Sequence, residues 1–343
     1  MPESPRRTGS SSIFTIPSPL RQLFSHFPLV TYAASELPVR CPDEESRTKN
    51  TLHVFSSPTD APRGLPSYNP TCLKWQVFLR LAGIEFETVA SNNHASPTGV
   101  LPFLLPRAPT AAIEAAREPE EKGTELGRIP LHHRAVLPVA SGKLEEFGLS
   151  YDGGAGGKRV GDVEGVMRAE VYQSLLDTRI RCAWLHSLYL APENTELLGR
   201  LYVNPISRSY VARASTLHSL RRAAEAEILR ATGTAVIDAG AIYAAADEAF
   251  EALSTVLGED DWFFGSEKGT DTKAGGEGAT EKEVDPRSKP SLFDAAVFSY
   301  THLLLDGDMA WQDRRLAELA AQSPALVRHR DRILDICWSE PVK

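Results

Sequence analysis

The sequence predicts two domains of different class, an α/β domain followed by an all-helical bundle. Between residues 52 and 106, a short apolar β-prone run, an amphipathic helix and a second β-prone run follow one another. Two strands joined by one helix pair in parallel through a right-handed crossover, which makes this a β-α-β unit. From residue 163 onwards, long segments repeat apolar residues at helical spacing. At 343 residues the chain is long enough for both domains.

The first helix has clear predicted ends. Asn69 is a preferred N-cap residue, and Pro70 suits the first helical position, where the N–H that it lacks would have no partner. Gly83 suits the C-terminal end because glycine readily adopts positive φ. The flanking strands are predicted at residues 52–57 and 86–90.

A proline directly before an apolar strand extends this pattern. Pro102 precedes one phenylalanine and two leucines. Because proline donates no N–H to a sheet, it belongs at a strand's first residue or in a cis turn. A β-α-β unit followed by such a proline is typical of a thioredoxin-like domain. We predict that this domain spans residues 52–150, with an inserted surface loop at 107–130, a strand at 135–140 and a short helix at 143–149.

The second domain is predicted to be an all-α bundle over residues 163–343, joined to the first by a glycine-rich linker at 151–162. Ser291 and Asp294 have the spacing of a capping box. The helix that they begin is apolar nearly all round, so it belongs in the middle of the bundle. The stretch 266–289 is rich in Gly, Glu, Lys and Thr and is predicted to be a mobile insert.

Further helices of the bundle are predicted at residues 163–191, 208–232, 239–257, 314–322 and 325–338. The expected buried face of the first of these consists of Val163, Met167, Val171, Leu175, Cys182, Leu185 and Tyr189. An apolar segment at 262–265 is expected to plug the core.

Composition excludes several classes of protein. The net charge of −8, with no basic cluster in the sequence, argues against non-specific nucleic-acid binding. No apolar run approaches the roughly 18–20 residues that span a bilayer, which favours a soluble or peripheral protein. The four cysteines are far apart, so they are expected to be reduced thiols in a cytosol-facing protein. We predict no metal site and no cofactor.

Residues 1–51 are predicted to form an N-terminal arm that is partly disordered. A mitochondrial presequence is the alternative for its first residues, but Glu3 and two early prolines argue against it. Segment 13–40 is rich in aromatic and aliphatic residues, and four prolines break any long element. Its side chains must be buried on the arm's own domain, on a partner or at a membrane. The candidate docking residues are Leu20, Leu23, Phe24, Phe27, Pro28, Leu29 and Tyr32.

Two segments resemble a known family. Residues 68–87, YNPTCLKWQVFLRLAGIEFE, resemble the N-terminal half of glutathione transferases and, within that superfamily, the metaxin branch. WFFG at 262–265 and KPSLFDAAVFSYTHLLL at 289–305 are also similar to metaxins. The resemblance covers most of residues 52–338 and implies a glutathione-transferase-like architecture.

The resemblance also implies a function. Metaxin-like proteins are non-enzymatic subunits of the sorting and assembly machinery of the mitochondrial outer membrane, on its cytosolic face. The implied partners are a membrane-embedded β-barrel subunit, a second metaxin-like subunit and incoming β-barrel precursor proteins. Because the sequence ends LVRHRDRILDICWSEPVK without a hydrophobic anchor, we expect the smaller, peripheral subunit of fungal complexes.

A redox site is a first enzymatic alternative. Asn69 stands where a thioredoxin-like C-x-x-C motif has its exposed first cysteine, and Cys72 stands at the inward-pointing last position. Disulfide exchange needs an accessible thiolate and a second thiol. We therefore expect Cys72 to be structural, like Pro102 and the capping residues Asn69, Ser291 and Asp294.

Glutathione transfer is the second enzymatic alternative. Transferases use a hydroxyl or thiol near the end of the first strand, for which Ser56, Ser57 and Tyr68 are candidates. They also use an acid–Ser pair at the start of the helix after the fourth strand. The stretch there reads ASGKLEEFG, which places Lys143 where that pair is expected. We expect no catalytic residues; a transferase or a soluble scaffold of a cytosolic complex remain the alternatives.

Overall fold

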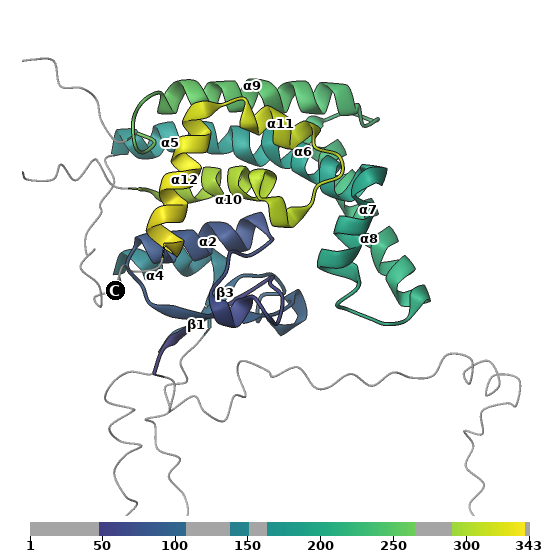
Figure 1. Ribbon diagram of the computed structural model, residues 1–343, viewed down its shortest axis with the longest axis horizontal. Helices are drawn as coiled ribbons and strands as arrows, with labels where there is room; N and C mark the ends of the chain where they lie inside the picture. The colour runs from purple at the N-terminus through teal and green to yellow at the C-terminus, as the bar shows by residue number, and fades with distance from the viewer. Residues whose placement is uncertain (1–47, 108–137, 151–162, 265–289, 340–343) are drawn as a thin grey trace, which may run out of the picture. The chain divides into compact units, whose positions relative to one another are not determined.

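The computed structural model describes residues 48–107, 138–150, 163–264 and 290–339, which lie in one compact unit (Figure 1). Several predictions fall outside the described residues. They are the arm up to residue 47 with all seven candidate docking residues, the inserted loop beyond Arg107, the linker 151–162 and the insert 266–289.

The N-terminal part is a mixed four-stranded sheet in the order β2-β1-β3-β4. β1 and β2 pair in parallel, with Leu52 opposite Thr88, and β3 runs antiparallel to β1, with Leu52 opposite Leu104. β4 is antiparallel to β3. The strands are β1 (Asn50–Val54), β2 (Phe86–Ala90), β3 (Phe103–Leu105) and β4 (Val139–Ala140). The Leu101–Pro102 peptide before β3 is cis.

β1 spans Asn50–Val54, so the bounds predicted for the first strand, residues 52–57, are wrong, and the strand begins two residues earlier. Asn50 is 2% exposed, and its Nδ2 donates to Glu85 O at 2.8 Å while its Oδ1 accepts from Arg107 N at 3.0 Å. A polar residue can begin a buried strand when its amide is hydrogen-bonded in this way. An apolar-run criterion does not detect such a residue.

Helix α2 (Pro70–Leu81) follows β1, with its N-cap at Asn69 as predicted. It packs against α10 (Leu292–Leu305), which is the main contact between the two domains (Figure 1). Residues 293–304 of α10 are all buried, so this helix lies in the middle of the core, as its nearly uniform apolar character predicts.

The predicted helix 163–191 alternates regular α-helical turns with wider π-helical turns. Its parts are α5 (Val163–Leu175), η6 (Leu176–Ile180), α6 (Arg181–Leu185) and η7 (His186–Leu190). Each π turn adds a residue to the helical repeat, so the buried face shifts along the chain. Val171, which a regular period places on the buried face, is 66% exposed, so that prediction is wrong. Leu185 and Cys182 are buried as expected.

α4 (Leu144–Ser150) packs against α2 and β4 in the N-terminal domain. The helices that complete the bundle are α7 (Thr195–Leu198), α8 (Tyr210–Thr232), α9 (Ala239–Leu257), α11 (Arg315–Ala321) and α12 (Pro324–Trp338). Trp262 and Phe263 are buried, as the predicted plug requires. No helix in the described part of the chain combines the length and apolar character needed to cross a membrane.

The C-terminal end of α12 joins the helical domain to the N-terminal domain through hydrogen bonds and a cation–π contact. Trp338 Nε1 donates to Gly64 O at 2.8 Å, and Arg80 Nη2 donates to the same carbonyl at 2.8 Å. The Arg80 guanidinium also lies 4.7 Å from the centre of the Trp338 ring and donates to Cys337 O. These contacts fix α2, and therefore the start of α2, relative to the bundle.

Candidate functional site at the junction of the two domains

Both polar atoms of the Asn69 side chain are engaged at the start of α2. Asn69 Oδ1 accepts from Cys72 N at 3.1 Å, which satisfies one of the free N–H groups of the first helical turn. Asn69 Nδ2 donates to the hydroxyl of Tyr202 in the helical domain at 3.0 Å. The residue at the position of a redox cysteine is therefore a cap that also bridges the two domains.

Cys72 is fully buried beneath this cap. Burial raises the pKa of its thiol to about 12, although hydrogen bonding with Phe55 and Ser67 acts in the opposite direction. At neutral pH the group is a protonated thiol without access to solvent. Because the thiolate is the nucleophilic form, this arrangement does not support disulfide exchange or thiol transfer.

Four aromatic side chains occupy the space between the end of β1 and the helical domain. We call Phe55, Tyr68, Tyr189 and Tyr202 the interdomain aromatic cluster. The Tyr202 ring centre lies 5.4 Å from that of Phe55, 5.3 Å from that of Tyr68 and 6.1 Å from that of Tyr189. The first two contacts are edge-to-face, an arrangement that stabilises aromatic pairs. Tyr202 is contributed by the π-helical turn η9 (Gly199–Val203).

Burial raises the pKa of each tyrosine in this cluster. The pKa of Tyr189 rises to about 12, and those of Tyr68 and Tyr202 also lie well above the ordinary value of 10.0. The phenols therefore stay neutral at physiological pH. The cluster is an apolar, hydrogen-bonded junction between the domains.

The three residues that could donate a hydrogen bond to a glutathione thiolate, Ser56, Ser57 and Tyr68, do not form a site for it. Ser56 is buried, and Tyr68 belongs to the interdomain aromatic cluster. Ser57 Oγ donates to Asp60 Oδ2 at 2.5 Å and accepts from Asp60 N at 3.0 Å, so this hydroxyl stabilises a local turn.

The backbone just before Pro102, at the start of β3, is also hydrogen-bonded within the chain. The N–H of Leu101, which precedes the cis peptide, donates to Asn93 Oδ1 at 3.1 Å. A bound peptide that needed this donor would have to displace the asparagine. Pro102 itself is buried and shapes the turn into β3.

The helix after β4 starts at a different residue from the one that the sequence suggested. The helical start here is η5 (Ser141–Lys143), so Ser141 is its first residue and Lys143 its third. A serine is thus present at this helix start, which the sequence interpretation missed. The residue before it is Ala140, so the acid–Ser pair is still incomplete. Lys143 Nζ instead forms an exposed ion pair with Glu146 Oε2 at 3.1 Å.

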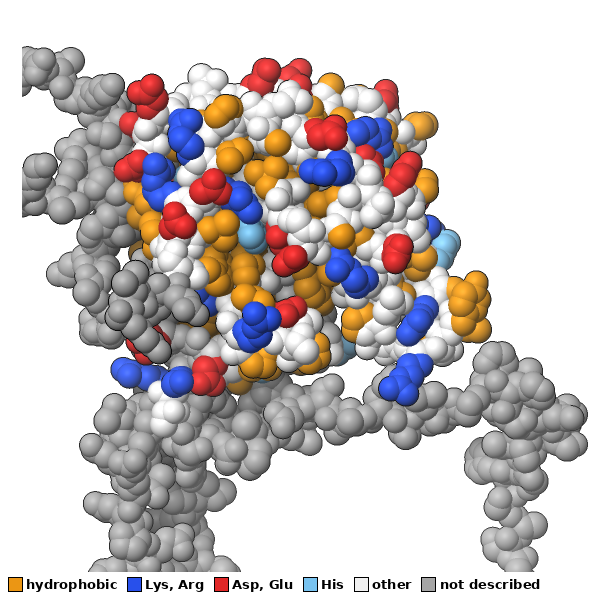
Figure 2. Space-filling model, in the orientation of Figure 1, with side chains coloured by type: hydrophobic (Ala, Val, Ile, Leu, Met, Phe, Trp, Pro, Cys, Tyr) orange, Lys and Arg blue, Asp and Glu red, His pale blue; other side chains and the backbone are white. Residues whose placement is uncertain are grey.

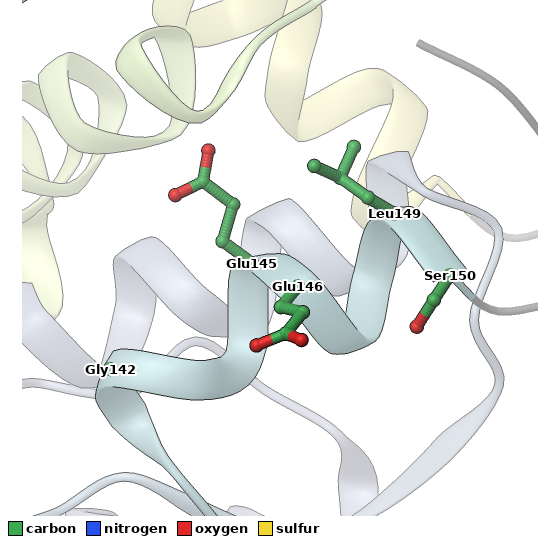
Figure 3. A pocket seen from close by; sticks show the side chains of 5 residues that line it. All are labelled: Gly142, Glu145, Glu146, Leu149 and Ser150. Carbon is green, nitrogen blue, oxygen red and sulfur yellow. The ribbon is translucent and has the colours of Figure 1, made fainter. Parts of the chain in front are cut away.

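An open depression lies on α4 near this turn (Figure 3). Its lining consists of Gly142, Glu145, Glu146, Leu149 and Ser150. Two carboxylates in so small a lining disfavour an anionic ligand such as a tripeptide with two carboxylates. The depression therefore adds no binding site for glutathione.

The second capping site, at the start of α10, is deeply buried. The Ser291 side chain accepts from Asp294 N, and Asp294 Oδ2 accepts from Ser291 N at 2.7 Å, which completes the predicted capping box. Asp294 Oδ1 also accepts from Phe263 N at 2.9 Å and lies 3.0 Å from His329 Nε2. Within the described residues, no three His, Cys, Asp or Glu side chains form a group that could hold a metal.

Two family models match the chain. The glutathione S-transferase N-terminal domain matches residues 70–118, and the glutathione S-transferase C-terminal domain matches residues 287–333. Together with the mixed α/β sheet and the helical bundle, these matches support a glutathione-transferase-like fold. A comparison with curated proteins gives no match.

The solved structures that match this chain are distant from it in sequence. The beta-etherase LigF from Sphingobium sp. strain SYK-6 has 13% identity and a TM-score of 0.43, over 84% of this chain and 95% of the other. A glutathione transferase family member from Pseudomonas fluorescens pf-5, with two glutathione bound, has 12% identity and a TM-score of 0.40, over 88% and 95%. At this identity we draw nothing about activity from either.

Proposed function

We propose that this protein is a non-enzymatic scaffold that acts as a peripheral subunit of the mitochondrial outer-membrane sorting and assembly machinery. On this proposal it lies on the cytosolic face and helps to recognise and insert β-barrel precursor proteins. Its partners are the membrane-embedded β-barrel subunit and a second metaxin-like subunit. The assignment to this branch of the glutathione-transferase-like proteins rests on the metaxin-like sequences at 68–87, 262–265 and 289–305.

The observation that carries the non-enzymatic part is the interdomain aromatic cluster. Tyr202 fills the junction at the end of β1 and is hydrogen-bonded to Asn69, the residue at the reactive position of the fold. A thiol substrate held there would need to displace a buried ring and break a bond between the domains. An efficient catalytic site holds its hydrogen-bond donors in place and leaves space for the substrate before the substrate binds. This junction therefore supports a scaffold rather than a transferase.

The experiment is affinity purification of the full tagged chain from mitochondrial membranes in mild detergent, followed by mass spectrometry. We expect a β-barrel outer-membrane protein and a second metaxin-like protein in the eluate, and release of this chain by alkaline extraction. Recovery of only cytosolic proteins would contradict the proposal and favour the cytosolic scaffold.

The N-terminal arm is proposed to dock on the barrel subunit or at the membrane. In the full chain, replacing Phe24 and Phe27 with serine removes two of the largest candidate docking side chains. We expect reduced recovery of the complex. A matched pair, Ser10→Ala and Ser12→Ala in the polar start of the arm, serves as control. Unchanged recovery with the phenylalanine variant would overturn the docking of the arm.

A glutathione-dependent transferase is the second candidate, and one observation favours it. Ser141 stands at the start of η5, the helix start where transferases carry the serine of their acid–Ser pair. Retention of the purified chain on immobilised glutathione, together with conjugation of glutathione to an electrophile, would support this candidate. We expect neither.

A further inference from the structure

The surface at the start of α8 exposes three apolar side chains. Ile206 is 54% exposed, Tyr210 is 84% exposed and Val211 is 60% exposed. Tyr210 and Val211 are the first two residues of α8, and Ile206 lies in the loop before it. We call these three residues the α8 tip. Elsewhere on the described surface, exposed large apolar residues are more scattered along the sequence, which is ordinary for a folded protein.

The loop that carries the α8 tip is held in place. Arg213 Nε donates to Ser207 O at 2.5 Å, which ties the loop to the second turn of α8. Ser209 N donates to Ser207 Oγ at 3.1 Å and Ile206 N donates to Val203 O at 3.2 Å. The exposure of the tip is therefore a property of an ordered turn, because backbone and side-chain bonds fix its shape.

Charge around the tip has the opposite sign to that of the protein. Residues 197–224 contain five arginines and no Asp or Glu, in a chain of net charge −8. Arg200, Arg213 and Arg221 donate to backbone carbonyls, which orient these side chains without neutralising them. Within the described residues, none of the five forms an ion pair. In Figure 2 the surface over the start of α8, at the lower right, shows blue and orange side chains without red ones.

The sequence alone did not indicate this patch, because its arginines are mostly spaced several residues apart. The fold places η9, which carries Arg200, in contact with α8, which carries Arg213, Arg221 and Arg222. Arg208 is the exposed arginine within the loop itself, between Ile206 and Tyr210. A charged head between an aromatic and an aliphatic side chain is the arrangement that suits a membrane–water interface.

We propose that the α8 tip binds the surface of an anionic lipid bilayer. Tyr210, Ile206 and Val211 enter the headgroup region, while Arg208 contacts lipid phosphates. This inference rests on the proposed function, since it names the surface by which the peripheral subunit lies on its membrane. It does not depend on the N-terminal arm.

Two other occupants fit less well. A nucleic acid would leave the aliphatic side chains unused, and its affinity depends on many phosphate contacts. A second copy of the chain in a two-fold symmetric contact would place this arginine-rich surface against itself, where like charges repel. An anionic bilayer is the partner that uses both the apolar and the basic side chains.

The test is cosedimentation of the full chain with vesicles of phosphatidylcholine, alone or mixed with phosphatidylserine. We expect binding to the mixed vesicles that weakens as salt is added. Arg208→Glu and Tyr210→Ser should each lower the partition coefficient by about fivefold or more, since one basic residue changes it by about that factor. The matched controls Arg230→Glu and Val236→Ser, about 30 Å away at the other end of α8, should leave it within twofold.

Several outcomes would overturn the inference. They are equal binding of tip and control variants, equal binding to both vesicle types, or no vesicle binding with retention on a single-stranded oligonucleotide. Sedimentation showing a dimer that the tip variants dissociate would assign the surface to a second copy. Recovery of the complex by affinity purification is measured separately. If the unaltered chain binds no vesicles but recovers the complex normally, only this inference is overturned; if it binds vesicles as expected but recovers no complex, only the proposed function is overturned.

Discussion

The starts of α2 and α10 are built in the same way but differ in what they hold together. Each begins with a polar cap residue whose side-chain oxygen accepts from the backbone N–H three residues later. At α2 the cap is the neutral Asn69, and its second bond reaches Tyr202 across the domain junction. At α10 the box includes the carboxylate of Asp294, which accepts from several donors within one domain.

The start of α10 therefore stabilises the helical bundle itself, whereas the start of α2 joins the two domains. A buried carboxylate surrounded by donors is expensive to disturb, because each donor would be left without a partner. A single neutral hydrogen bond between domains contributes about 1 kcal/mol. We therefore expect the start of α10 to govern global stability and the start of α2 to govern how firmly the two domains associate.

The largest expected effect follows from removing the α10 carboxylate. Asp294→Ala leaves the backbone N–H groups of Ser291 and Phe263 and the ring nitrogen of His329 without their acceptor in a buried region. We expect the free energy of unfolding to fall by about 3–5 kcal/mol, measured by urea denaturation.

Asp238→Ala is the matched control for this change. Asp238 caps α9 through Ala241 N at 3.1 Å but is exposed and makes this one cap bond. A loss of about 1 kcal/mol is expected for such a cap. Equal losses for the two variants would show that the buried donors around Asp294 contribute nothing beyond capping.

The second effect concerns pH and the same helix. His302 of α10 is buried, and within the described residues neither ring nitrogen has a hydrogen-bond partner. Burial, together with the charge of Arg330, lowers its pKa from 6.5 to about 4. The folded state thus favours the neutral ring. The stabilisation of the folded state by this neutral ring is complete above pH 6.5. It is lost as pH falls from 6.5 to about 4, which lowers the free energy of unfolding by roughly 3 kcal/mol.

His302→Leu tests this titration. Leucine is close to histidine in volume and needs no hydrogen bonds, so we expect unchanged or slightly higher stability at pH 7. The decline of unfolding free energy between pH 6.5 and 4 should become shallower than in the wild type. An identical pH profile for the variant would assign the acid sensitivity to other groups.

The sequence was informative where the interacting residues are neighbours in the chain. The capping box of Ser291 and Asp294 and the cap at Asn69 are bonds between residues three apart, and both could be predicted. The buried character of α10 and the proline before β3 were also visible, because composition and one special residue encode them. These features are enough to predict the fold.

The sequence was uninformative where contacts are distant or where a helix departs from a regular period. Asn69 and Tyr202 are 133 residues apart, so no local pattern shows that a tyrosine closes the junction. The π-helical turns shift the buried face and made the placement of Val171 wrong. Ser141 was missed because the exact helix start after a two-residue strand has no strong sequence signal.

The smallest expected effect is the coupling between Asn69 and Tyr202. Tyr202→Phe keeps the ring in the interdomain aromatic cluster and removes only the hydroxyl, whereas Asn69→Ala removes both the cap and the bridge. In a double-mutant cycle we expect a coupling energy of about 0.5–1.5 kcal/mol, measured from the free energies of unfolding. The control cycle pairs Tyr202→Phe with Asp238→Ala, a cap with no bond to the cluster, and should give zero. A coupling of zero in both cycles would mean that the hydroxyl of Tyr202 does not link the domains, and that ring packing alone closes the junction.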